Sequence, residues 1–82
     1  MRIRIEEQEY GGTGAEIMEQ LWLEHEPDGI SDVEGYIRYV CTNFTRTTGL
    51  AVTLPEGGVE EQALAVIRCL AEAGAVLLLD GY

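Results

Sequence analysis

Apolar residues are most concentrated in the segment Gly57–Asp80, and their spacing predicts a helix, a glycine stop and a strand. On a helical wheel with about 100° per residue, the apolar side chains of Val59–Ala73 cover an arc roughly twice as wide as that of an ordinary surface helix. The remaining polar stripe contains Glu61, Arg68 and Glu72. We therefore expect this helix to be mostly buried, either in the core of the chain or at a contact between subunits.

Gly74 stands where a left-handed residue closes this helix, and the run Ala75–Leu79 that follows is continuously apolar. Such a run predicts a strand that is covered on both faces or lies in the centre of a small sheet. Leu50–Leu54, closed by Pro55, predicts another strand. Residues 50–79 would then form a strand, a helix and a strand. The length of this unit fits two parallel strands joined by a right-handed crossover helix.

The first residues favour a short strand and a hairpin. Polar and apolar residues alternate over Arg2–Ile5, which predicts a half-buried strand with its arginines facing water on a sheet edge. Glu9–Tyr10 is a candidate for a short second strand. Thr13 and Glu16 have the spacing of a capping box, so a helix is expected to start there.

This first helix is expected to run to about His25, because the proline of Glu26–Pro27 disfavours a helical residue before it. Ser31 and Glu34 repeat the capping-box spacing. They predict a second helix that runs to about Thr48 and stops at Gly49.

The predicted order is strand, short second strand, helix, helix, strand, helix, strand. It indicates an α+β fold in which residues 1–82 form one small two-layer domain, with three main helices packed on a small sheet. A winged-helix arrangement is the alternative, because Leu70–Leu79 also resembles a recognition helix that runs into a wing. The last predicted helix carries one arginine and three glutamates, which argues against reading DNA.

Charge excludes several classes of partner. The chain has fifteen acidic residues, five arginines and no lysine, for a net charge of −10. This balance excludes direct binding to a nucleic-acid backbone and disfavours adsorption to an anionic membrane. A strongly negative charge ordinarily serves to keep a protein soluble. A more specific interpretation is that the chain binds a basic protein partner or is a decoy that imitates the charge of DNA. The start of the chain lacks the apolar core of a signal peptide, so we expect a cytoplasmic protein.

The sequence contains no motif that supports a catalytic site or a cofactor site. Gly11–Gly14 opens a helix as a phosphate loop does, but the lysine that such a loop needs is absent. His25 is the only histidine and has no partner at zinc-ligand spacing. Cys41 and Cys69 are expected to be buried, reduced thiols. We therefore expect no catalytic residue, no metal and no cofactor, and a protein that is not an enzyme.

Four side chains are candidates for a protein-binding face. Trp22 and Tyr39 lie at the margins of, or away from, the apolar faces of their helices, where such aromatic residues favour interfaces. Leu23 lies on the polar side of the first helix, and Arg46 lies on the same side of the second as Tyr39. These residues predict an interaction module whose partner is another protein or a second copy of the chain. An inhibitor that imitates DNA and binds a nucleic-acid-binding protein is the alternative.

Parts of the chain resemble a group of small phage and prophage proteins of unknown function. The resemblance rests on residues 9–18, on Tyr36–Ile37 and on the ending Leu70–Gly74, in which an alanine-rich helix closes with Glu-Ala-Gly. It implies no activity and no functional residues. It does imply a bacterial, phage-derived accessory protein.

Overall fold

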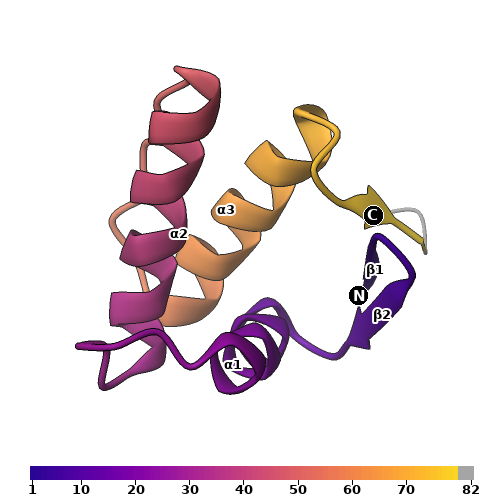
Figure 1. The fold of residues 1–82 in the computed structure, drawn as a ribbon, viewed down its shortest axis with the longest axis horizontal. Coiled ribbons are helices and arrows are strands. Elements are labelled where there is room, and N and C mark those ends of the chain that lie inside the picture. Colours follow the sequence, from indigo (N-terminus) through magenta and orange to yellow (C-terminus); the bar gives the residue numbers. More distant parts are fainter. Residues whose placement is uncertain (80–82) are drawn as a thin grey trace.

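The computed structural model describes residues 1–79, which form three helices packed on a small sheet, the expected α+β class (Figure 1). Two strands come first and are followed by three helices and a last strand. Their bounds are β1 (Arg2–Ile5), β2 (Gln8–Gly11), α1 (Gly14–His25), α2 (Val33–Thr48), α3 (Val59–Glu72) and β3 (Leu77–Leu78). The short second strand expected at Glu9–Tyr10 is therefore present as β2.

The sheet has the order β2-β1-β3, and both pairings are antiparallel. β1 is the central strand, so the prediction that it would be an edge strand is wrong. Its alternation is as expected, because Ile3 is fully buried while Arg2 and Arg4 are exposed. The neighbours of a strand depend on contacts made far away in the sequence, and alternation alone does not reveal them.

The predicted strand at Leu50–Leu54 is absent, and with it the parallel crossover unit. This segment is an irregular connection in which Val52 and Leu54 are half-buried and pack against the core. Its apolar residues anchor the connection through their side chains. Figure 1 shows this segment running beside α2, on the side of α3 away from the sheet, so it reaches no sheet edge.

The last strand is shorter and more exposed than the continuous apolar run suggests. Val76 is buried, whereas Leu77 is 56% exposed and Leu79 is 38% exposed. β3 pairs with β1 alone, with Leu78 opposite Ile3. It is therefore an edge strand covered on one face, and the expectation of a central or doubly covered strand is wrong.

The helix ends follow local chemistry closely. Thr13 and Glu16 form the predicted capping box, with the Thr13 Oγ1 accepting from the Glu16 N–H at 3.1 Å. Gly49 and Gly74 take up the left-handed backbone expected after α2 and α3, with φ of 77° and 81°. The cap of α2 is Asp32, one residue later than the predicted Ser31. Its Oδ1 accepts from the Gly35 N–H at 2.7 Å, and a carboxylate also suits the positive end of the helix.

The core is made by all three helices and the sheet together. The fully buried side chains of largest volume are Ile3, Ile17, Met18, Ile37, Val66 and Ile67. Only three residues of α3 are buried, and most of the rest of its wide apolar arc is half-buried. Val59, Leu70 and Ala71 of this arc pack against the core of the same chain, so the arc is largely used within one molecule.

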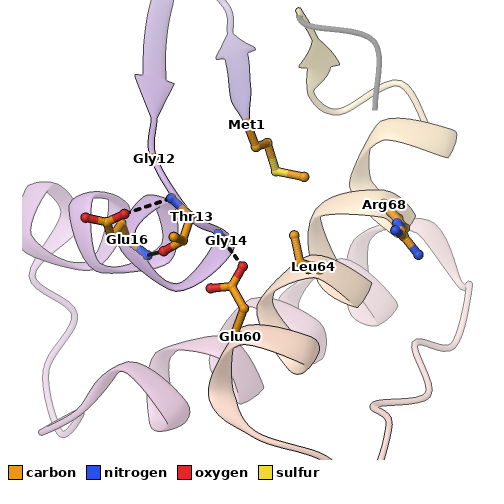
Figure 2. A pocket seen from close by; sticks show the side chains of 8 residues that line it. All are labelled: Met1, Gly12, Thr13, Gly14, Glu16, Glu60, Leu64 and Arg68. Atoms are coloured by element: carbon orange, nitrogen blue, oxygen red, sulfur yellow. Dashed lines mark hydrogen bonds between the residues drawn. The ribbon is translucent and has the colours of Figure 1, made fainter.

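A carboxylate of α3 closes the start of α1. Glu60 accepts a hydrogen bond from the Gly14 N–H at 2.8 Å (Figure 2) and a second one from the Ala15 N–H, also at 2.8 Å. Gly14 permits this approach, since a Cβ there would lie 3.0 Å from Leu64 Cδ2 and 3.1 Å from Glu60 Oε2. The Ala15 N–H, followed by the Gly14 N–H, holds the pKa of Glu60 below its ordinary value. The charged carboxylate thus joins two helices that are distant in sequence.

Replacing Glu60 with Gln is expected to lower the free energy of unfolding by about 1–2 kcal/mol at neutral pH, because an amide can accept only one of the two bonds. Since the pKa of Glu60 is lowered in the folded state, this stabilisation is present above the ordinary carboxyl value of 4.5 and is lost as the pH falls below it. Urea unfolding of both proteins across this range measures the change.

Glu61→Gln is the matched control, because it removes the same charge from the first turn of α3 without removing a hydrogen bond to α1. Equal losses in the two variants would contradict the role given to Glu60. A difference between Glu60→Gln and the natural protein that stayed constant down to acid pH would contradict it too.

Candidate functional site

The clearest candidate site is a small hollow where α1 ends and the chain turns toward α2. Its volume is about 210 Å³, and its lining consists of Trp22, Leu23, Glu26, Pro27 and Ile30. Leu23 is 60% exposed, the largest value among the exposed large apolar side chains of residues 1–79. We call this feature the corner hollow.

Local backbone chemistry builds the corner hollow. Glu26 caps α1 in a left-handed conformation, with φ of 44°, and its N–H donates to the Trp22 carbonyl oxygen at 2.8 Å. A non-glycine residue rarely adopts this conformation, and here it lies directly before a proline, which cannot continue the helix. The chain therefore leaves α1 sharply, and Pro27 comes to line the same hollow as Trp22.

The corner hollow has an acidic rim. Glu19 lies three and four residues before Trp22 and Leu23 on α1, so it shares their side of the helix. Glu26, which caps α1, lines the hollow itself. The side chains of Glu19 and Glu26 are exposed, whereas Trp22 is half-buried and packs against the core. This face therefore presents an apolar centre between two carboxylates.

Two of the four predicted binding residues meet in this hollow and two lie elsewhere. Tyr39 is 42% exposed and stacks on Tyr36 with a ring-centroid distance of 5.9 Å. Arg46 lines a different hollow, between α2 and the connection that contains Val52. Tyr39 and Arg46 share a face of α2 because they are seven residues apart. Neither residue belongs to the lining of the corner hollow.

Pro27 and Ile30 are site residues that sequence reasoning missed. The turn signal at Pro27 marks where the helix ends, but it gives no direction for the chain that follows. The exposure of Leu50 and Leu77, 56% for each, was also unforeseen, because Leu50 was assigned to a strand and Leu77 to a covered or central strand. Their exposure follows from the missing strand and from the edge position of β3.

The titratable groups near the end of α1 are engaged in local contacts. The Tyr10 hydroxyl donates to Glu24 Oε2 at 2.6 Å, and His25 Nδ1 lies 2.8 Å from the Leu21 carbonyl oxygen. Burial, and then the bond to Glu24, raises the pKa of Tyr10 to about 12. Within residues 1–79 no three His, Cys, Asp or Glu side chains are grouped so that they could hold a metal ion.

The two cysteines are free and half-buried rather than fully buried. Burial raises the pKa of Cys41, which keeps this thiol protonated and poorly nucleophilic. In the part of the chain that the structure describes, no helix combines the length and the apolar character that crossing a membrane requires. Comparisons with protein families, with curated proteins and with solved structures find no match to this chain.

Replacing Tyr10 with Phe is expected to lower the free energy of unfolding by about 1 kcal/mol near neutral pH, because the hydrogen bond to Glu24 is lost. The raised pKa of Tyr10 also makes the natural protein lose stability as the pH rises from 10 toward 12, and this loss should be smaller in the variant. Urea unfolding at neutral and alkaline pH measures both effects.

Tyr39→Phe serves as the control, because the Tyr39 hydroxyl makes no hydrogen bond within residues 1–79 and should be dispensable. A Tyr10→Phe protein as stable as the natural one at neutral pH would show that the bond to Glu24 contributes nothing.

Proposed function

We propose that this protein is a non-enzymatic interaction module that binds a basic, apolar segment of another protein at the corner hollow. The observation that carries the proposal is the exposure of Leu23 beside the half-buried Trp22. An exposed leucine that borders a half-buried indole and a proline forms an apolar anchor point. Aromatic residues at such positions are frequent hot spots of protein interfaces.

The size of the hollow favours a side chain over a small molecule as its occupant. Its volume of about 210 Å³ is below the roughly 300–1,000 Å³ of ordinary small-molecule sites. One apolar side chain of a partner fits such a space. Glu19 and Glu26 then stand beside the anchor, where lysine or arginine residues of the partner would meet them.

Charge supports a partner other than a second copy. Each chain carries −10, so two copies repel each other, whereas a basic partner is attracted. The wide apolar arc of α3 also packs largely against its own chain, which leaves little of it for a dimer. Self-association through the corner hollow is thus the less favoured form of this proposal. The resemblance to phage proteins favours a bacterial accessory protein that acts in the cytoplasm.

Imitation of DNA charge is the second candidate. Every carboxylate side chain of residues 1–79 is exposed except that of Glu60, which is half-buried. A nucleic-acid-binding protein would recognise such a surface mainly through its positive charge. Its binding would then weaken steeply with salt and depend little on Leu23.

The test is a capture experiment from a bacterial lysate with three baits: the natural protein, Leu23→Asp and Leu77→Asp. Leu77 is the matched control, because this leucine on β3 is 56% exposed, close to the 60% of Leu23, and lies outside the corner hollow. A partner that binds at the hollow should be lost with Leu23→Asp and kept with Leu77→Asp. Its affinity, measured by titration, should fall by about 30-fold, the equivalent of a hot-spot loss of about 2 kcal/mol.

Salt separates the two candidates. A partner anchored at the corner hollow should survive a high-salt wash on the natural bait, because its apolar contact is not screened. A partner that both leucine variants capture and that high salt releases would favour the charge mimic. Sedimentation of the natural protein should show a monomer, and a dimer that Leu23→Asp dissociates would identify a second copy as the occupant.

A further inference from the structure

A second and larger hollow, independent of the corner hollow, lies between the β2–α1 turn and the outer face of α3 (Figure 2). Its volume is about 480 Å³, within the range of ordinary small-molecule sites. Its lining consists of Met1, Gly12, Thr13, Gly14, Glu16, Glu60, Leu64 and Arg68. We call it the α3 hollow.

The lining of the α3 hollow is ordered by charge. Glu60, Leu64 and Arg68 follow one another at four-residue spacing along one face of α3. Figure 2 shows Glu60 at one end of this row, Leu64 in the middle and Arg68 at the other end. Met1 lies across from Leu64 and adds a second apolar side chain. The hollow is therefore acidic at one end, apolar in the middle and basic at the other end.

The acidic end keeps a negative charge although it adjoins a helix N-terminus. Glu16 and Glu60 bring two carboxylates to the start of α1, against about half a positive charge from the helix dipole and one from the amino terminus of Met1, which also acts on Glu60. The bonds from the Ala15 and Gly14 N–H groups also favour the charged form of Glu60. Some of the lone pairs of both carboxylates remain open to a donor from a ligand.

The basic end has a guanidinium available for an anion. Arg68 is exposed, and no carboxylate within residues 1–79 forms an ion pair with it. A guanidinium can hold a carboxylate through two parallel hydrogen bonds. The chain has a net charge of −10 and repels anions over most of its surface, so a carboxylate is expected to bind preferentially at Arg68, which lies beside the apolar part of the hollow.

We propose that the α3 hollow binds a linear aliphatic zwitterion, with its ammonium at Glu60 and Glu16, its chain on Leu64 and Met1, and its carboxylate at Arg68. Glu60 and Arg68 are eight residues apart, which is about 12 Å along the helix. Hydrogen bonds of about 3 Å at each end leave a ligand of about 6–12 Å between its charged groups. An ω-amino acid with a chain of intermediate length, such as ε-aminocaproate, meets this requirement.

The test is a titration of the ¹⁵N-labelled protein followed by NMR, with ε-aminocaproate, caproate, hexylamine and glycine as probes. The proposal expects saturable shifts of the Gly12–Gly14 amides and of the Arg68 Nε–H with ε-aminocaproate. Caproate and hexylamine, which carry one charge each, should bind at least several-fold more weakly. Glycine is too short to reach both ends and should not saturate the site.

Arg68→Gln should weaken binding of ε-aminocaproate by about tenfold or more, because a charge-assisted hydrogen bond is lost. Arg38→Gln is the matched control: Arg38 is exposed on α2, lies outside the α3 hollow and should be dispensable. Equal binding by hexylamine and ε-aminocaproate would overturn the proposal, as would equal effects of the two variants. Absence of saturable shifts with ε-aminocaproate would overturn it as well.

Discussion

The placement of α3 against α1 depends on one long-range contact, in which the Glu60 carboxylate accepts hydrogen bonds from the first N–H groups of α1. The first N–H groups of a helix have no partner within the helix and carry partial positive charge. Glu60 supplies two acceptors and a full negative charge at 2.8 Å from two of them. This contact fixes where α3 crosses the start of α1, and the close packing of Leu64 on Gly14 follows from it.

The orientation of α1 then determines which of its side chains face solvent. Ile17, Met18 and Leu21 are buried in the core, so the opposite face of the helix must carry Glu19 and Leu23 outward. A polar residue at position 23 would cost nothing in the core and would avoid exposing an apolar surface to water. Leu23 differs from the other exposed leucines because it borders a hollow with Trp22 and Pro27, and this contiguous apolar surface makes the corner hollow the better candidate for function.

Local chemistry made several elements predictable. The capping box at Thr13 and the left-handed glycines at positions 49 and 74 act within a few residues, so the sequence pattern contains the whole interaction. The exposure of Leu23 was predictable for the same reason, because a helical wheel separates the faces of α1. The neighbours of Leu23 in the corner hollow were not, because the path of the chain after Pro27 depends on how α2 packs.

The sheet was less predictable because strands need partners from elsewhere in the chain. Leu50–Leu54 has the composition of a strand but lies far from any sheet edge, and β3 finds only β1. The hydrogen bonds between Glu60 and α1 could not be predicted either, because they also join segments far apart in the sequence. A glutamate in the first turn of α3 already has a local explanation in the dipole of its own helix, and nothing in the sequence indicates that it serves a second helix.

The same carboxylate limits what the α3 hollow can bind. Both oxygens of Glu60 already accept N–H groups of α1, so a ligand ammonium can use only the remaining lone pairs. A ligand that pulled Glu60 away from α1 would have to replace two charge-assisted bonds that stabilise the fold. The acidic end can therefore hold a ligand ammonium only through these lone pairs, which gives less affinity than an unengaged carboxylate would. Selectivity in this hollow must come from the distance to Arg68 and from the apolar surface of Leu64 between the two charges.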